Sequence, residues 1–465
     1  MIRKIIGSLI ALLAGCAASP QMDSPLVDKV EMQLARADKF DSHHAYIYLA
    51  RQQAIATAKK LSTSKAKENL PLFGMTLAIK DNIEIAGMPN SVGHKLLENY
   101  QPATDATVIQ RVKDAGAIIM GKTNLHELTY GITSNNSAFG AVANAHNIDK
   151  FAGGSSGGTA VAIALGLADA GLGTDTGGSA RIPAALNGIV GFRPTTGRYP
   201  NAGMNMISTT RDTVGPMAKD VATVARLDAV LAGEKLAHEE KSVPGKLRIG
   251  VPKSYFYDNL SADVTKGMER VFKALADSGV ELVVADVNNI GELNDQVGFP
   301  IVLFETRQLL PSLIKRANPG LSLDDFIEGI SSPDVKGIVS SLVTTPIPED
   351  VYRKAIDSSR PKLQSAYATY FHTHQLDALI VPATPLAAQN ISGSDETIML
   401  NGNAAPTFPT FIRNTDPSSN AGIPSLVIPM GTNFEGLPIA LQLDGPVDSD
   451  RKLLAIGKHV EALIK

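Results

Sequence analysis

The chain has 465 residues, of which 44% are hydrophobic and 19% charged, and its formal net charge is -3 at pH 7. These values exclude a disordered or collagen-like chain and are typical of a folded protein with a large core. The basic residues form no cluster or stripe, so nucleic acid is not an expected partner.

The first 24 residues predict an export signal followed by a tether. Two basic residues and an apolar run, within residues 3–13, lead to Cys16, the only cysteine of the chain. Small residues before a cysteine at this place resemble the cleavage site of bacterial lipoproteins. We therefore expect residues 1–15 to be a lipoprotein signal peptide, Cys16 to carry the lipid, and residues 16–24 to form a polar tether.

The residue after Cys16 bears on the destination of the protein. It is Ala17 and not an aspartate, a pattern that in Gram-negative bacteria is typical of outer-membrane lipoproteins. We expect an exported protein that is held at the outer membrane by its lipid and faces the periplasm. The alternative that stays open is an ordinary secretory signal cut near Ala17 or Ala18, which would remove Cys16.

The first half of the remaining chain alternates between helical and strand patterns. Apolar residues at helical spacing or in short buried runs predict these elements. In chain order they are a helix over 24–61, a strand over 75–80, a helix over 106–115, a strand over 117–120 and a helix over 159–170 that starts from a Gly-Gly loop.

The second half continues this alternation and ends in a closing helix. The expected elements are strands over 247–251, 281–287, 377–381, 425–428 and 437–443, helices over 262–278 and 452–463, a mostly helical stretch over 290–375, and a long polar loop over 389–420 near the mouth of the pocket. The pattern predicts a single α/β domain over residues 25–465. Its sheet is expected to be large, mixed and mostly parallel, with helices on both faces.

Two clusters of glycine and serine, at residues 153–158 and 173–179, flank one apolar segment. Glycine lets the backbone approach a ligand closely, and a serine held in such a turn can act as a nucleophile once a base takes its proton. None of the nine histidines pairs with a Ser/Asp arrangement, and no metal-binding spacing is present. Lys80, at the end of an apolar strand, is the candidate base, because burial lowers the pKa of an amine.

The segments GGSSGG at 153–158 and GTDTGGSARIPAA at 173–185 resemble the amidase signature family. Ser155 and Ser179 stand at the spacing of the two catalytic serines of that family, and AIKDN at 78–82 is similar to the segment with its lysine. The resemblance runs through residues 71–216. It returns more weakly in the segments 377–385, 421–429 and 436–445.

The resemblance implies a role for each residue of this set. Ser179 would be the nucleophile, Ser155 a bridging serine that follows a cis peptide bond, and Lys80 the base that receives the proton through Ser155. No cofactor and no metal are implied. The oxyanion hole would consist of the backbone N–H groups of Thr176, Gly177, Gly178 and Ser179.

Asp175 and Arg181 lie on either side of the nucleophile with opposite charges. We expect them to form an ion pair that supports the loop, and a direct contact with the substrate is the alternative. Ser156 is expected to be structural, since the spacing assigns the bridging role to its neighbour.

The expected reaction is hydrolysis of a carboxylic amide, through an acyl-enzyme, to the acid and ammonia or an amine. Segments 87–91 and 121–128 are similar to those of stand-alone amidases of the indoleacetamide and mandelamide hydrolase type. The expected partner is a small-molecule or peptide amide, and the protein is expected to be a monomer or homodimer. Two alternatives stay open: the amidase subunit of a tRNA-dependent amidotransferase, and a non-catalytic binding lipoprotein on the same fold.

Overall fold

The computed structural model describes residues 24–64, 70–235 and 246–465. The predicted signal peptide, Cys16 and all but the last residue of the predicted tether lie outside these residues, so the structure says nothing about them.

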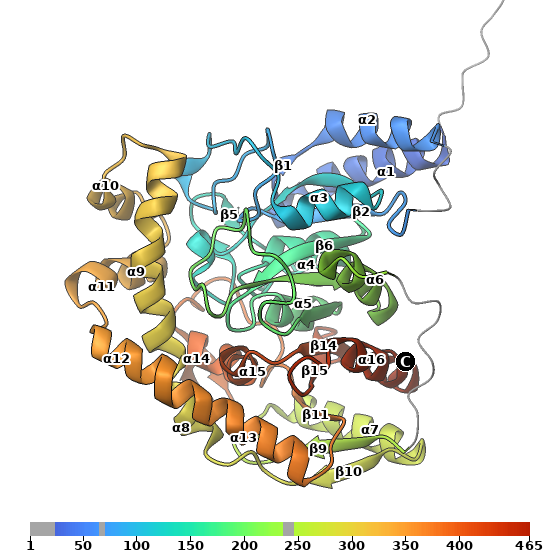
Figure 1. Cartoon of the computed structure of the whole chain (residues 1–465). Helices are drawn as coiled ribbons and strands as arrows, with labels where there is room; N and C mark the ends of the chain where they lie inside the picture. The colour runs from blue at the N-terminus through green and yellow to red at the C-terminus, as the bar shows by residue number, and fades with distance from the viewer. Residues whose placement is uncertain (1–23, 65–69, 236–245) are drawn as a thin grey trace, which may run out of the picture.

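One large sheet runs through the whole molecule (Figure 1). Its strands are β1 (Tyr46–Leu49), β2 (Thr76–Lys80), β3 (Ile118–Thr123), β6 (Ala170–Asp175), β7 (Val190–Arg193), β8 (Thr213–Ala218), β9 (Arg248–Val251), β10 (Glu281–Val284), β11 (Ala378–Pro382), β14 (Ser425–Thr432) and β15 (Pro438–Asp444). Within the described residues these 11 strands pair in the order β1-β3-β2-β6-β8-β7-β14-β15-β11-β9-β10. Two small antiparallel pairs lie outside this sheet: β4 (Asn135–Asn136) with β5 (Gly140–Ala141), and β12 (Thr397–Leu400) with β13 (Asn403–Pro406).

The sheet is mixed, as predicted, but the expectation that it is mostly parallel is wrong. Six of the ten pairings in the described sheet are antiparallel, and only β2 with β3 and β6, and β9 with β10 and β11, are parallel. A short connection such as the one between β14 and β15 can join only antiparallel strands. In addition, β8 lies between β6 and β7 and runs opposite to both. The alternation of helix and strand along the chain does not encode that placement.

Helices cover both faces of the sheet, as predicted. On one face lie α1 (Pro25–Lys39), α2 (Arg51–Ser62), α4 (Gly157–Ala164), α5 (Arg181–Asn187), α13 (Arg360–Thr373) and α15 (Asp416–Ala421). On the other lie α3 (Thr107–Asp114), α6 (Val221–Ala232), α7 (Ala262–Asp277) and α16 (Asp450–Ile464). Three helices begin with a polar cap: Ser24, Asp220 and Ser261 accept a hydrogen bond from the third backbone N–H of α1, α6 and α7.

A group of helices stands beside the sheet, on the left of Figure 1, and one further helix contacts β13 of the small β12–β13 pair. The group comprises α8 (Ile290–Asp295), α9 (Gly298–Ala317), α10 (Leu323–Glu328), α11 (Pro333–Thr344) and α12 (Glu349–Lys354), and the further helix is α14 (Thr407–Ile412). We call α9, α10 and α11 the cap. An apolar cluster joins the cap to the segment after β3, with Leu310, Phe326 and Val339 packed near Leu128 and Tyr130.

Three of the expected elements differ in the structure, and β6, β7, β8, α5 and α6 were not among the elements expected. The helix expected over 24–61 is two helices with β1 between them, because the chain turns at His44, whose φ is 50°. The helix expected over 159–170 ends at Ala164, and Gly166, with φ +70°, turns the chain into β6. The long loop expected over 389–420 contains β12, β13, α14 and α15. These elements are short, and their apolar residues show no clear period in the sequence.

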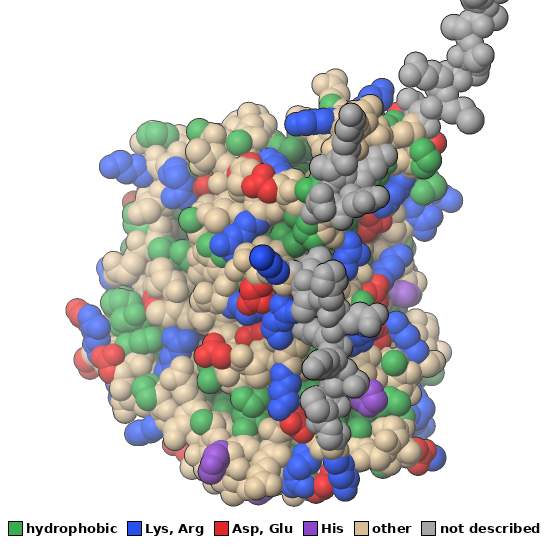
Figure 2. Space-filling model, turned by 45° about the vertical axis from the view of Figure 1, so that its right-hand side comes forward, with side chains coloured by type: hydrophobic (Ala, Val, Ile, Leu, Met, Phe, Trp, Pro, Cys, Tyr) green, Lys and Arg blue, Asp and Glu red, His purple; other side chains and the backbone are tan. Residues whose placement is uncertain are grey.

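The surface carries mixed charge. Among the described residues on the face shown in Figure 2, Lys and Arg side chains are interspersed with Asp and Glu and gather into no basic stripe. This arrangement offers no extended electrostatic track on that face.

Candidate active site

Lys80 is the last residue of β2 and lies inside the sheet, between β3 and β6. Its side chain is fully buried, and its Nζ donates to Ser155 Oγ and Thr174 Oγ1, both at 2.8 Å. Burial lowers the pKa of the Lys80 amine to about 7, while the charges of Asp212 and Asp175 oppose this shift. An amine with this pKa is partly unprotonated at neutral pH and can accept a proton.

Ser155 lies in the turn that leads into α4. Its peptide bond with Gly154 is cis, which agrees with what the family resemblance implied. Its carbonyl oxygen accepts hydrogen bonds from the backbone N–H of His126 at 3.1 Å and from Ser134 Oγ at 3.4 Å. Because its hydroxyl is bonded to Lys80, this serine is held at both its backbone and its side chain.

The two serine clusters are hydrogen-bonded to each other. The backbone N–H of Ser156 donates to the carbonyl oxygen of Ser179 at 3.0 Å. The Ser156 hydroxyl donates to the carbonyl oxygen of Thr174 at 3.1 Å and accepts from its N–H at 3.2 Å. Ser156 thereby fixes the position of one cluster relative to the other, which is a structural contact.

Ser179 lies in the loop between β6 and α5 and is half-buried. The loop lines a cavity together with this serine. In the described part of the chain, four successive backbone N–H groups of the loop donate to no protein acceptor: those of Thr176, Gly177, Gly178 and Ser179. Unpaired donors beside a serine could stabilise negative charge on an oxygen that forms there.

Gly178 shows why this loop requires glycine. Its φ is +141°, and a Cβ at this position would lie 2.2 Å from Thr415 Oγ1. The same Thr415 hydroxyl donates to the carbonyl oxygen of Gly177 at 2.6 Å. Any side chain at position 178 would push the loop away from the start of α15.

Asp175 and Arg181 form the expected ion pair. Arg181 Nη2 lies 2.9 Å from Asp175 Oδ1, its Nε lies 3.0 Å from Oδ2, and both side chains are fully buried. Arg193 adds a contact of 3.1 Å to the same carboxylate. Burial alone would raise the pKa of Asp175, but the two arginines hold it well below its usual range. The carboxylate therefore stays charged and anchors the loop at its base.

Three residues of this centre were not singled out from the sequence. Thr174 precedes Asp175 on β6, and the parallel pairing of β2 with β6 could have placed it near Lys80. Asp212 accepts a 2.6 Å hydrogen bond from the Thr176 hydroxyl, and Arg193 reaches Asp175 from β7. These last two come from later segments, and no local pattern in the sequence links them to the loop.

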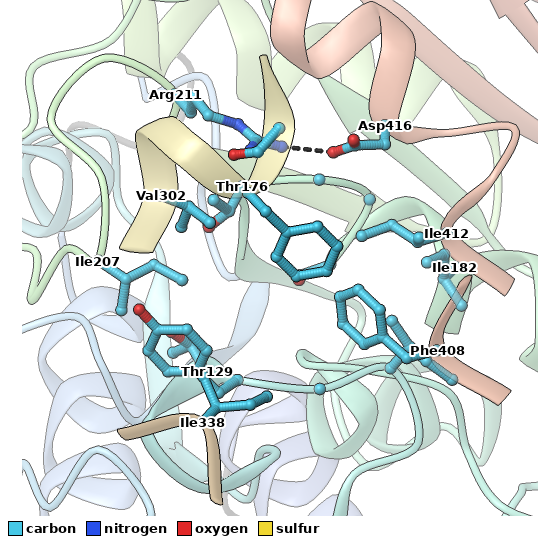
Figure 3. A pocket seen from close by; sticks show the side chains of 18 of the residues that line it. Thr129, Thr176, Ile182, Ile207, Arg211, Val302, Ile338, Phe408, Ile412 and Asp416 are labelled. Carbon is cyan, nitrogen blue, oxygen red and sulfur yellow. Dashed lines mark hydrogen bonds and ion pairs between the residues drawn. The ribbon is translucent and has the colours of Figure 1, made fainter. Parts of the chain in front are cut away.

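The cavity beside Ser179 measures about 660 Å³, including its open mouth. Figure 3 shows Ile182, Phe408 and Ile412 along one side and Thr129, Ile207 and Ile338 along the other. The Phe299 and Phe408 rings, from α9 and α14, lie 5.8 Å apart at 43°. The walls are thus largely apolar and aromatic.

The two charged residues of the wall, Arg211 and Asp416, are paired with each other (Figure 3). Arg211 also donates to the carbonyl oxygen of Gly298 at 2.8 Å. The second carboxylate oxygen of Asp416 accepts from Asn294 at 3.1 Å and from Asn420 at 2.9 Å. The charges of this wall are therefore already balanced within the protein.

Among the described residues, no group of three or more His, Cys, Asp or Glu side chains is placed to hold a metal ion. Beside the cavity, the candidate reactive groups are the hydroxyls of Ser155 and Ser179, the Lys80 amine and the backbone N–H groups of residues 176–179. Here a buried amine is hydrogen-bonded to a serine, and a second serine and free N–H donors lie nearby. Such an arrangement is typical of enzymes that attack a carboxyl derivative with a serine.

The comparisons with known proteins agree with this class. The family model described as Amidase matches residues 28–454, and the chain therefore belongs to the amidase family. It is 41% identical to the indoleacetamide hydrolase of Rhizobium radiobacter over 443 residues, which cover 95% of this chain and 94% of that protein. It is 37% identical to the mandelamide hydrolase of Pseudomonas putida over 459 residues, covering 94% and 87%.

Among solved structures, one described as a crystal structure of amidase has a TM-score of 0.83 and 32% identity, over 95% of this chain and 97% of that one. The protein is thus a hydrolase that acts on amides. The expected amidase fold, apart from its mostly parallel sheet, and the hydrolysis of amides are confirmed, and the resemblance to stand-alone amidases holds along most of the chain.

Proposed function

We propose that this amidase hydrolyses uncharged carboxamides with an aromatic acyl group, with Ser179 as nucleophile, Ser155 as proton relay and Lys80 as base. The observation that carries the proposal is the 2.8 Å contact between the buried Lys80 amine and the Ser155 hydroxyl, next to an apolar cavity that Ser179 lines.

The reaction then follows from the groups at hand. Ser179 Oγ attacks the amide carbon, and its proton passes through the Ser155 hydroxyl to neutral Lys80. The carbonyl oxygen becomes an oxyanion held by the free N–H groups of residues 176–179. When the C–N bond breaks, the proton returns to the nitrogen and ammonia leaves. Water, activated by the same relay, then releases the acid and restores the serine.

The walls of the cavity support an aromatic substrate. An aryl group packed against the touching rings of Phe299 and Phe408 would bury apolar surface and make favourable ring contacts. Two relatives are named for the hydrolysis of indoleacetamide and mandelamide. We extend these names to this chain only as a class of substrate: amides of arylacetic acids.

The cavity gives less support to the amidotransferase alternative. Glutamine, which carries both an ammonium and a carboxylate, would need charged partners that are not already engaged. Of the charged side chains on the cavity wall, Arg211 and Asp416 bind each other. Placing glutamine there would cost the desolvation of two charges without new ion pairs.

The experiment is a panel of primary amides assayed for ammonia release with a soluble form that lacks residues 1–16. We expect phenylacetamide and indole-3-acetamide to be hydrolysed with higher kcat/KM than acetamide or glutamine. Ser179→Ala should lower kcat/KM by about 10⁴-fold or more, since it removes the nucleophile.

The matched control is Ser312→Ala, the same substitution at an exposed serine on α9, which should behave as wild type. Turnover that survives in Ser179→Ala would contradict the proposed nucleophile. Preference for glutamine over the aryl amides would instead favour the amidotransferase alternative.

We also propose that the protein is exported and held at the outer membrane, facing the periplasm, by a lipid on Cys16. The support is the sequence pattern alone: basic residues, an apolar run, and small residues before the only cysteine. Cells supplied with a palmitate analogue should label wild type, whereas Cys16→Ser should stay unlabelled. Equal labelling of the two would refute the anchor.

A further inference from the structure

A second cavity lies next to the one that Ser179 lines. Its empty space amounts to about 370 Å³ when its open mouth is included, so the space enclosed by the side chains is much smaller. Most of its lining is aliphatic: Val92, Leu128, Met206, Leu310, Leu313 and Val339. No group of the reaction described above uses this space.

The two cavities follow one another along a single helix. Phe299, Val302 and Leu303 of α9 line the first cavity, and Thr306, Leu310 and Leu313 line the second. Residues at this spacing lie on one face of a helix, so one stripe of α9 borders both spaces. At a rise of 1.5 Å per residue, the stripe from 299 to 313 extends about 21 Å. On α11, Ile338 lines the first cavity and its neighbour Val339 lines the second.

Two residues, Tyr130 and Ile207, line both cavities and therefore form the wall between them. Figure 3 shows Ile207 on the side of the first cavity where Thr129 and Ile338 also lie. The Tyr130 hydroxyl is hydrogen-bonded to Thr306 Oγ1 of α9. Thr306 Oγ1 in turn lies 2.8 Å from the carbonyl oxygen of Ile207. The wall is thus closed by one ring and by a hydrogen-bonded chain that joins all three residues.

We propose that Tyr130, with Ile207, sets the upper limit on the length of the acyl group, and that the second cavity is an apolar extension of the substrate site closed by the Tyr130 ring. This inference rests on the proposed function, in which the acyl group of the amide occupies the first cavity. With the ring removed, a straight alkyl chain would continue along the α9 stripe into the second cavity.

The test uses straight-chain primary amides of increasing length, from butanamide to dodecanamide, and measures kcat/KM for each. For wild type, kcat/KM should fall steeply once the alkyl chain exceeds a certain length. In Tyr130→Ala the fall should move to longer chains, and the ratio of kcat/KM for a long amide to that for butanamide should rise by about tenfold or more, since each buried methylene adds about threefold to fourfold. Tyr130→Phe keeps the ring and should keep the wild-type limit.

Ile207→Ala opens the same wall from the other residue and should shift the limit in the same direction, which keeps the inference testable if Tyr130→Ala does not fold. Adding Leu313→Trp to Tyr130→Ala should refill the second cavity and restore the short limit. Phe408→Ala, on the far side of the first cavity, should change activity without moving the limit.

Binding provides a readout that does not depend on turnover. Titration calorimetry with octanamide should detect tighter binding to Ser179→Ala/Tyr130→Ala than to Ser179→Ala alone. If the opened variants hydrolyse butanamide with the wild-type length limit, or bind octanamide no better, the inference is overturned. If wild type hydrolyses no amide while octanamide still binds the opened variant more tightly, the proposed function fails and the cavity assignment stands.

Discussion

At the scale of single residues, the proposed chemistry depends on how the Lys80 amine is kept unprotonated. Lys80 is fully buried and donates to two hydroxyl oxygens. Because burial lowers the pKa of its amine to about 7, a large share of the protein holds a neutral base at neutral pH. An exposed lysine, with a pKa near 10.4, would be almost wholly protonated and unable to take the serine proton.

This pKa predicts the acid side of the pH profile. The base works when it is deprotonated, so kcat/KM for an aryl amide should fall as pH decreases below about 7 and level off above it. In Asp212→Asn the fall should move to lower pH, because the negative charge that raises the pKa of Lys80 is lost. Initial rates between pH 5 and 9, in buffers of constant ionic strength, measure both profiles.

Lys80→Met provides the control, since it should lose the activity together with its pH dependence. If the decrease of kcat/KM occurs at the same pH in Asp212→Asn as in wild type, or if Lys80→Met keeps full activity, a group other than Lys80 is the base.

At the scale of elements, the cap is tied to the core by two acidic contacts. His126 Nε2 lies 3.0 Å from Asp334 Oδ2 at the start of α11, and the backbone N–H of Ser332 donates to Glu127 Oε2 at 2.8 Å. The backbone N–H of Ser134 donates to His126 Nδ1 at 3.1 Å, so that nitrogen is an acceptor and Nε2 carries the hydrogen. The ring of His126 also fills the space beside Gly131, where a Cβ would lie 2.2 Å from it.

His126 therefore connects the cap to both the cavity wall and Ser155, the serine of the proposed relay. Its backbone N–H donates to the carbonyl oxygen of Ser155, and its ring lies beside Gly131, which lines the cavity together with Ile338 of α11. Sequence reasoning set this histidine aside because it lacks a metal-binding partner. Its role in holding the site depends on Asp334, which is more than 200 positions away.

This contact predicts a binding defect when it is broken. Asp334→Ala should raise KM for aryl amides by about threefold to tenfold, the value of one hydrogen bond, and change kcat less. Asp334→Asn keeps an acceptor for the Nε2 hydrogen and should stay close to wild type. Steady-state kinetics of both variants, with the exposed Asp324→Ala of α10 as control, measure the effect. A fall in kcat at constant KM would place Asp334 in the chemical step instead of in cap docking.

At the scale of the whole molecule, one buried network joins the loop of Ser179 to segments near the end of the chain. Arg181 Nη1 donates to Ser418 Oγ of α15 at 2.9 Å and to Ser425 Oγ of β14 at 3.0 Å. The same nitrogen donates to Gln442 Oε1 of β15 at 3.3 Å. The guanidinium can satisfy these acceptors only if β14, β15 and α15 are in place. The position of the loop is therefore a property of the complete sheet.

The sequence alone determined the groups to which the proposal assigns the chemistry. Glycines beside serines, at a fixed spacing, and a lysine at the end of an apolar strand are local features, and each survives as a contact or a cavity residue in the structure. Most strands and helices were also predictable, because an apolar period of two or of 3.6 residues is written in consecutive positions. The short elements of 389–420 were missed, since they are too brief to show a period, and β6, β7, β8 and α6 were not predicted either.

Only the tertiary structure decided what lies around these groups. The direction of β8 between β6 and β7, the approach of Asp212 and Arg193, the cap contact of His126, and the wall that Tyr130 and Ile207 form between two cavities all join residues far apart in the chain. Such contacts arise when packing of the whole core selects one arrangement of strands and helices, and no short segment encodes them. The class of reaction could thus be predicted from the sequence, whereas the shape of the substrate site follows from the fold.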